Sequence, residues 1–444
     1  MNDLKDRKAQ LQQLVEDMLR EASSQGASAA EAGVNFDIGL SASVRLGEVE
    51  TIEHTRDQGM GISVYFGHKK GSASTSDFKP EAVRDAVRAA CNIAKFTTQD
   101  PYAGLADAER MASEQPDLDL YHPWTIDVDE VIARGIECEA AARDLDPRIT
   151  NSEGATLNTH CGVQVYGNSH GFIGGYPSSQ HSLSCAVVGQ EGDSMQRDYW
   201  YTSARNPEDM ESAQAVGRRA GERTLARLGA RQIDTCEAPV IFQAETAVSL
   251  LRGFIGAISG SALYRRSSFL LDHIERQIFP EFVRIRENPL LPRGAASAPF
   301  DSEGVATTPK DLVRDGVLKS YILNSYSARK LNMATTGNAG GVRNLSIDSG
   351  ELDLAGLLRQ MDTGLLVSEL MGSGLNMVTG DYSRGAAGFW VEHGEIQFPV
   401  EEITIAGNMK QMFAGMQAVA SDVERRGSIR TGSWLLEPMK IAGS

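Results

Sequence analysis

Hydrophobic residues change their spacing repeatedly along the first half of the chain. Over residues 4–19, apolar side chains recur at helical spacing, which predicts an amphipathic helix that ends near Gly26. Apolar residues then alternate with small or polar ones over residues 34–40 and 62–66, as is typical of antiparallel strands. The glycines and charged residues of segment 67–71 predict a hairpin turn after the second of these strands.

The same kinds of element then repeat. A second helix is predicted to start at Pro80, because proline is well tolerated in the first turn of a helix. A third helix, a second β-rich block and a fourth helix follow, over residues 128–143, 149–201 and 207–228. This order predicts an α+β N-terminal domain, residues 1–235, with helices packed on antiparallel sheets. We interpret it as two related units, about 1–120 and 121–235.

A domain boundary is indicated at residues 230–237, where the helical pattern stops and a buried strand begins at Ala238. The second domain, residues 236–444, is richer in glycine and in short strands. One long helix and one clear hairpin are predicted within it, over residues 245–259 and 385–405. The predicted fold class is therefore α+β, with a β-rich C-terminal domain that has one prominent helix.

The charge of the chain narrows the choice of partners. A formal net charge of −16 is unfavourable for non-specific binding to nucleic acid, which requires basic surface, so we expect no nucleic-acid partner. No apolar run reaches the ~18 residues of a membrane span, and the chain start lacks the pattern of a secretory signal. We therefore expect a cytoplasmic protein. The five cysteines are widely spaced and predict reduced, buried thiols.

The histidines of the chain do not have the spacing of a metalloprotease site. A metalloprotease helix presents two histidines one turn apart beside a carboxylate, and the eight histidines of this chain include no such pair. His160, His170 and His181 lie in the second β-rich block and could converge with Cys161 or Cys185 only if the strands aligned. We predict no metal site and no cofactor in this chain.

Ser169 is the candidate nucleophile, because segment 167–171 reads Gly-Asn-Ser-His-Gly and matches the letters of a nucleophile elbow. An elbow joins a strand to a helix, however, and residues 172–188 continue as a glycine-rich extended segment. We interpret 167–171 as a turn between two strands. An independent hydrolase that uses Ser169 or the nearby histidines remains an alternative.

Three glycine-rich segments were compared with phosphate-binding loops. Segments 59–61 and 372–374 lack the third glycine and the lysine of those loops, so both are interpreted as turns. Segment 336–341, Thr-Gly-Asn-Ala-Gly-Gly, has amides that could bind a carboxylate or a peptide backbone, with Arg343 adjacent. A plain loop is the alternative for this segment.

Five short motifs relate the chain to known proteins. They are Asn-Ser-Glu-Gly at 151–154, Pro-Phe-Asp-Ser-Glu-Gly-Val at 299–305, Asp-Gly-Val-Leu-Lys-Ser-Tyr at 315–321, Ser-Ala-Arg-Lys-Leu at 327–331 and Thr-Gly-Asn at 336–338. Together they resemble the TldD/PmbA family over nearly the whole chain. The resemblance implies two domains, the second with a barrel-like β core. Catalytic members carry His-Glu-x-x-x-His and a metal on the first helix of that domain.

The functional positions of that helix are occupied by other residues here. Aligned on Leu250-Leu251, the chain has Arg252 and Ala257 at the two histidines and Gly253 at the glutamate. Arg252 cannot replace a histidine, because a protonated guanidinium offers no lone pair to a cation. The cysteine near the end of catalytic members also has no counterpart, since Cys236 is the last cysteine. These departures match the PmbA/TldE branch.

The resemblance implies a non-catalytic subunit of a cytoplasmic metalloprotease complex that degrades or matures small or unfolded peptides. Its partner would be a TldD-type homologue holding zinc or a similar divalent metal, and a homodimer is possible when that partner is absent. We expect Arg252, Asn338 and Arg343 to line the chamber that faces the metal subunit. A regulatory binding protein of the gyrase-modulator type, without enzyme activity, is an alternative.

Overall fold

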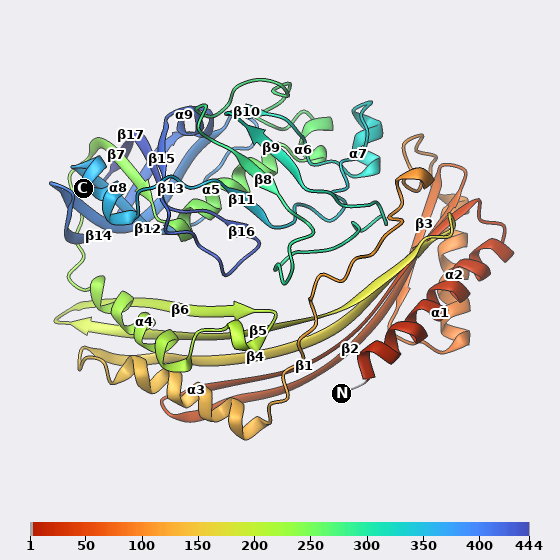
Figure 1. Ribbon diagram of the computed structural model, residues 1–444, viewed down its shortest axis with the longest axis horizontal. Helices are drawn as coiled ribbons and strands as arrows, with labels where there is room; N and C mark the ends of the chain where they lie inside the picture. Colours follow the sequence, from red (N-terminus) through yellow and green to blue (C-terminus); the bar gives the residue numbers. More distant parts are fainter. Residues whose placement is uncertain (1–2, 444) are drawn as a thin grey trace.

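The computed structural model describes residues 3–443 and consists of a long, curved antiparallel sheet beside a C-terminal β-rich body (Figure 1). The sheet has six strands in the order β3-β2-β1-β4-β5-β6. Their bounds are β1 Ala29–Arg45, β2 Glu48–Phe66, β3 Lys69–Thr75, β4 Ile149–Asn168, β5 Ile173–Glu191 and β6 Ser194–Ala204. β1 pairs with β4 from Glu31 opposite Asn168 to Val44 opposite Ala155, so the first two predicted units share one sheet.

Four helices pack on the sheet, two near each end (Figure 1). They are α1 Asp3–Ser24, α2 Pro80–Phe96, α3 Val128–Arg143 and α4 Ala213–Ala226. Successive side chains of β1 point to opposite faces of the sheet. Val34 and Phe36 are buried with α1 and α2, while Glu31 and Gly33 line a pocket on the other face. α3 and α4 lie so close that a Cβ at Gly217 would be 1.9 Å from the Cys138 carbonyl oxygen, which requires glycine there.

The observed elements differ from the predicted ones in three respects. β1 and β2 are longer than the apolar alternation indicated, and for β2 the reason is that residues 48–57 are exposed on both faces. Gly59 and Gly61 do not form a turn but lie inside β2, opposite Asn35 and Ser74 respectively. The fourth helix begins later than predicted, since residues 207–209 form a separate 3₁₀ turn and Ser212 caps α4 by accepting a hydrogen bond from the Ala215 amide.

The C-terminal body contains a closed β-barrel, as the family resemblance implied. Its strands are β7 Cys236–Phe242, β12 Gly364–Met371, β13 Asp381–Glu392, β14 Glu395–Asn408 and β17 Trp434–Ala442. The ring closes because β14 pairs with β13 on one side and with β17 on the other, and β15 Met416–Val419 is added to β17. A smaller sheet has the order β10-β9-β8-β11-β16.

The remaining elements are short. The strands of the smaller sheet are β8 Ile285–Glu287, β9 Lys310–Arg314, β10 Val317–Leu318, β11 Leu345–Ile347 and β16 Ile429–Arg430. The helices of the C-terminal body are α5 Ala244–Ala257, α6 Gly260–Tyr264, α7 Ser325–Lys330, α8 Leu354–Met361 and α9 Met409–Ala414. Ala108–Arg110 forms another 3₁₀ turn. The predicted prominent helix corresponds to α5, which packs its apolar side into the core beside β7 and β12.

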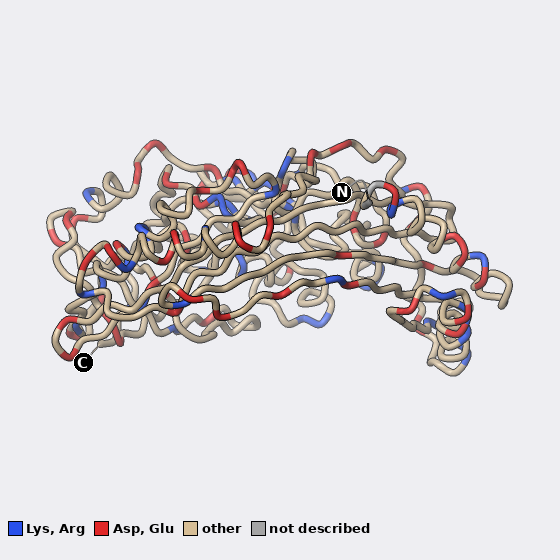
Figure 2. The backbone as a smooth tube through the Cα atoms, turned by 90° about the horizontal axis from the view of Figure 1, so that it is seen from below, with Lys and Arg blue, Asp and Glu red and all other residues tan. Residues whose placement is uncertain are grey.

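Two predictions from composition can be compared with the structure. All five cysteines are free thiols, and Cys236 alone among them is only partly buried. Within residues 3–443, no helix combines the length and the hydropathy that a membrane span requires. Figure 2 shows acidic and basic positions interspersed along the molecule.

Candidate functional site

The first candidate site is the helix α5, where the family's catalytic members hold their metal. Arg252 is exposed, whereas Gly253 and Ala257 are buried. A Cβ at Gly253 would be 3.0 Å from Leu375 Cδ2 and 3.1 Å from Met409 Cε, so apolar side chains occupy the space beside it. Ala257 is fully buried in the main hydrophobic core. A glutamate at 253 and a histidine at 257 would therefore clash with the apolar side chains that pack there.

The donor set of α5 does not fit a metal ion. Arg252 is a cation without a lone pair to donate, and its two partner positions have no coordinating atoms. Over the part of the chain that the structure describes, no group of three or more histidine, cysteine, aspartate or glutamate side chains could hold a metal. No catalytic step through a metal is therefore assigned to this chain's own residues.

The histidines of the second β-rich block lie in separate environments. His181 is buried between Thr159 Oγ1 and the His122 carbonyl, each 2.9 Å from a ring nitrogen, and burial lowers its pKa. His160 lies 3.3 Å from an oxygen of Asp37, and a ring nitrogen of His170 is 3.1 Å from the Ala106 carbonyl. Their separate partners fit structural roles.

Ser169 lies in the turn between β4 and β5, as predicted. Its Oγ accepts a hydrogen bond of 3.1 Å from the Ala30 amide, and the Gly171 amide donates to the Asn168 carbonyl. Strands precede and follow this turn, so the strand-to-helix geometry of a nucleophile elbow is not formed. Ser169 therefore helps to hold the turn against β1.

Arg252 lines a small pocket of about 220 Å³ where β6 meets the C-terminal body. Among the described residues its guanidinium has no ion pair or hydrogen bond, which distinguishes it from the neighbouring arginine, Arg426. Arg426 is paired with Glu424 and lies 3.0 Å from Glu245 Oε1. Its guanidinium also lies 3.6 Å from the ring centre of Trp200, on β6. Arg426 therefore joins the two domains, while Arg252 faces the pocket unpaired.

Asn338 and Arg343 lie in a different place, around the buried Glu287. Asn338 Nδ2 donates to both carboxylate oxygens of Glu287, at 2.8 and 3.0 Å, and the Arg343 amide donates at 2.6 Å. Lys310 Nζ is 3.2 Å from Glu287. Asn338 is only 4% exposed, so its side chain shapes the 336–341 loop from within. The neighbouring residues Ala339 and Gly340 line a pocket between the sheet and the C-terminal body.

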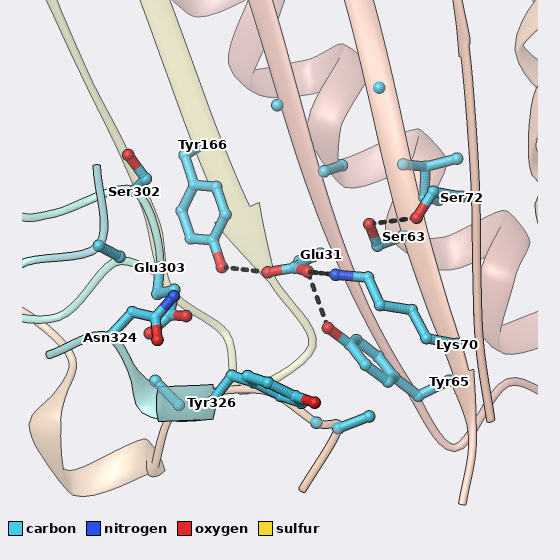
Figure 3. A pocket seen from close by; sticks show the side chains of 18 of the residues that line it. Glu31, Ser63, Tyr65, Lys70, Ser72, Tyr166, Ser302, Glu303, Asn324 and Tyr326 are labelled. Carbon is cyan, nitrogen blue, oxygen red and sulfur yellow. Dashed lines mark hydrogen bonds and ion pairs between the residues drawn. The ribbon is translucent and has the colours of Figure 1, made fainter. Parts of the chain in front are cut away.

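A pocket of about 1030 Å³ lies between the sheet and the loops of the C-terminal body (Figure 3). Glu31 is at the centre of the sheet wall. Its Oε1 accepts hydrogen bonds from Tyr65 Oη at 2.9 Å and Lys70 Nζ at 3.1 Å, and its Oε2 accepts one from Tyr166 Oη at 3.1 Å. Burial and the charge of Glu31 raise the pKa of both tyrosines, so each phenol keeps its proton.

The facing wall of this pocket is formed by the motif at 299–305. Asp301 fixes its shape, because Oδ1 accepts from the amides of Glu303 at 2.9 Å and Val305 at 3.0 Å, while Oδ2 accepts from the Ala339 amide at 2.9 Å. Glu303 extends toward the pocket, opposite Glu31 (Figure 3). Burial raises the pKa of Glu303, the neighbouring carboxylates add to this effect, and hydrogen bonding from Ser325 acts against it.

This pocket was not identified from the sequence. The motif that contains Glu303 was visible and served only to establish the family resemblance. Glu31, Tyr65 and Tyr166 stand in strands far apart in the chain, and nothing local distinguishes them from other residues on an exposed face. The pairing of β1 with β2 and β4 brings the three together.

Family models match three successive parts of the chain. Models of the PmbA/TldA metallopeptidase domain 1, central domain and C-terminal domain match residues 30–94, 121–228 and 235–443. The chain belongs to the PmbA/TldD family. Metalloprotease PmbA of Escherichia coli is 49% identical over 95% of this chain and 94% of its own length. The PmbA homologue of Haemophilus influenzae is also 49% identical, over 99% and 98% respectively. These relatives place the chain in the PmbA/TldE branch.

Solved structures of the PmbA/TldD fold also match nearly the whole chain. A protein from Bacteroides thetaiotaomicron, described as a proposed modulator of DNA gyrase, has a TM-score of 0.93 and 26% identity, covering 97% of this chain and 98% of its own. TldE from Thermococcus kodakarensis has a TM-score of 0.85 and covers 97% and 100%; at 20% identity, it supports the fold alone.

Proposed function

We propose that this chain is the metal-free subunit of a peptidase pair that acts on small or unfolded peptides. Its partner is a metal-bearing homologue of TldD type, with zinc or a similar divalent ion. The observation that supports this most is the residue set of α5, where Arg252 and Ala257 replace the two histidines and Gly253 replaces the glutamate of catalytic members. The names of its 49%-identical relatives support a role in proteolysis.

A subunit without catalytic residues contributes surface to such a pair. Peptide substrates are read in extended form, along a strand edge or in a groove. Among the pockets between the sheet of this chain and its C-terminal body, one lies beside Arg252 and one beside Glu31 and Glu303. This subunit would then supply half of the substrate groove, and its partner would supply the metal. Substrate binding would involve both subunits, whereas catalysis would take place at the partner's metal.

Reconstitution tests the proposal. The purified chain, the purified metal-bearing homologue and their equimolar mixture are assayed on an unfolded peptide, each with and without a chelator. We expect hydrolysis by the mixture only, and its loss on chelation, because the metal of the partner would activate the water. Chelator-resistant hydrolysis by this chain alone would overturn the proposal, and the Ser169→Ala variant would then show whether Ser169 is responsible.

Arg252 provides a second test within the assembled pair. Its unpaired guanidinium can bind a substrate carboxylate, so Arg252→Ala is expected to raise KM about tenfold for a peptide with a free C-terminus, or about 1.4 kcal/mol. The same peptide with an amidated C-terminus is the matched control and should show little change. Equal KM values for wild type and variant on the free-acid peptide would show that Arg252 does not contact substrate.

A regulatory binding role is the second candidate. It is favoured by the descriptions of the Bacteroides protein and of a Thermotoga maritima protein, 25% identical with a TM-score of 0.87, as proposed modulators of DNA gyrase. Direct binding of this chain to purified gyrase, with no association with a TldD-type homologue, would favour this role over the peptidase pair.

A further inference from the structure

We propose that the pocket between Glu31 and Glu303 binds a primary ammonium group, with the Glu303 carboxylate as its counter-ion. If the proposed peptidase function holds, this group is the N-terminus of a peptide. A small free amine would present the same chemistry, and the experiment below separates the two.

The charges around the pocket are unbalanced. Three carboxylates line it, those of Glu31, Asp100 and Glu303, against the single ammonium of Lys70. Counted over these four side chains, the lining has a surplus of two negative charges. A cationic ligand is therefore favoured over an anionic one.

Two of the three carboxylates already have partners within the protein. Glu31 accepts hydrogen bonds from Lys70 and from two phenols. Asp100 accepts one of 2.8 Å from Tyr326 Oη and one of 3.1 Å from the Tyr102 amide, and these two hydrogen bonds are the main causes of its lowered pKa. Asp100 is therefore stabilised in its charged form without a ligand, and Glu31 already accepts three hydrogen bonds within the protein.

Among the described residues, Glu303 has no cationic partner and fewer hydrogen-bond donors than the other two carboxylates. Its Oε2 accepts a hydrogen bond of 3.0 Å from the Ser325 amide, but among residues 3–443 no lysine, arginine or histidine nitrogen lies within 4.0 Å of its carboxylate. A partly buried carboxylate without a counter-ion is costly, and Asp301 and Glu31 add like charge nearby. A bound cation would remove this cost.

The position of Glu303 is fixed before a ligand arrives. Asp301 holds the turn through three backbone amides, and the Ser302 amide donates to the Ala339 carbonyl at 3.0 Å. Gly304 has φ +79° and is packed against Phe172, so the turn admits little change. A carboxylate held in this way binds its ligand without a further ordering cost.

The other polar atoms of the pocket suit an ammonium group. It has three donors that point in different directions, and the acceptors here come from both walls. Tyr65 and Tyr166 donate their protons to Glu31, and Tyr166 Oη accepts from Asn168 Nδ2 at 3.5 Å, so each phenol oxygen keeps a lone pair that can accept from a ligand. A metal ion fits less well, because the described residues offer no converging set of three ligand side chains.

The pocket is also large enough for a chain attached to the ammonium. Its volume is about 1030 Å³, and small side chains, Gly33, Gly61, Ser63 and Ser72, line the sheet wall beyond Glu31. Ser63 Oγ and Ser72 Oγ, 2.9 Å apart on neighbouring strands, offer further hydrogen-bonding groups. An extended peptide can therefore continue from its N-terminus across the sheet.

Calorimetric titration of the full, isolated chain tests the proposal. The probes are tetra-alanine amide with a free N-terminus, the same peptide N-acetylated, and 1,5-diaminopentane. We expect the free peptide to bind at least tenfold more tightly than the acetylated one. Tighter binding of the peptide than of the diamine would identify a peptide terminus as the ligand, and the reverse order would identify a small amine.

Two variants show whether Glu303 itself binds the peptide, or whether a change in net charge or in folding alters the binding. Glu303→Gln should weaken binding of the free peptide at least tenfold, while the exposed Glu109→Gln should leave it unchanged. Glu303→Gln should also unfold at the same or a higher temperature than wild type, because it removes an unpaired, partly buried charge, so lost binding cannot be ascribed to misfolding. Equal binding of both peptides, or full binding by Glu303→Gln, would overturn the proposal.

These measurements are independent of the proposed pairing. They use the isolated chain and record binding, so they do not require the metal-bearing homologue. Failure of reconstituted hydrolysis would leave the ammonium site intact, and failure of binding would leave the peptidase pair intact.

Discussion

Replacing Arg426 with alanine is expected to lower the free energy of unfolding by about 3–5 kcal/mol, the range for removing one member of a buried ion pair. The Arg426 side chain is 11% exposed and the Glu424 side chain 10%, so the variant leaves a buried carboxylate without its cation. The guanidinium also stacks on Trp200 and Tyr201 of β6, at 3.6 and 4.4 Å from the ring centres. Urea unfolding of the two proteins measures the difference.

The adjacent Arg425 supplies a matched control, because its side chain is exposed and Arg425→Ala should change stability by less than about 0.5 kcal/mol. The pH gives a second check. Burial acts to raise the pKa of Glu424, but the hydrogen bonds and charge of Arg426 outweigh it, so the folded pKa lies below the ordinary value of about 4.3.

This lowered pKa fixes the sign of the pH effect. A carboxylate whose folded pKa is depressed stabilises the protein above its unfolded pKa, and the contribution is lost as the pH falls through the folded value. The difference between wild type and Arg426→Ala should therefore be full at pH 7 and shrink below about pH 4. A difference that is the same at pH 7 and pH 3 would show that stacking, and not the ion pair, is responsible.

Glu287→Ala is expected to destabilise the chain by a similar amount, about 3–5 kcal/mol. Glu287 is 1% exposed and accepts hydrogen bonds from Asn338 and the Arg343 amide, with Lys310 Nζ 3.2 Å away. Its removal leaves the Arg343 amide without its acceptor and the mostly buried ammonium of Lys310 without its counter-ion, and such groups are costly to leave unpaired. Denaturant unfolding measures the loss.

The control for this variant is Glu281→Ala, since Glu281 is exposed and precedes the same strand. It should unfold like wild type. The double variant Glu287→Ala with Lys310→Met should recover part of the stability, because it removes the unpaired cation together with its acceptor. A single variant as stable as wild type would show that water or another group replaces Glu287.

The elements predicted best depend on neighbours in the sequence. α3 begins and ends where the pattern indicated, at Val128 and Arg143, and Asp127 caps it by accepting from the Glu130 amide. The turn at Ser169 and the hairpin of β13 and β14 were also predicted correctly. In each case, the residues that determine the structure stand within a few positions of one another.

The predictions from sequence fail where the structure depends on contacts between segments that are distant in the chain. Gly59 and Gly61 resemble a turn when taken alone, and they are strand residues because Asn35 and Ser74 pair with them across the sheet. The barrel was expected from the family resemblance and not from periodicity, because its closing pairs, such as Ile405 opposite Ile441, join remote parts of the chain. The Glu31 pocket combines residues from four strands, from α7 and from the loops at 97–106, 302–303 and 339–340, which no local pattern marks.

The pairing of β1 with β4 has a consequence for the order in which the protein can fold during synthesis. The β1 backbone has β2 on one side, but its other side finds no partner until the ribosome has made β4, which begins at Ile149. Until then the nascent chain displays the open edge of a long strand with an apolar face, the kind of surface that pairs with other copies. A chain interrupted within α3 would therefore be prone to aggregate, although α1 and α2 are already complete.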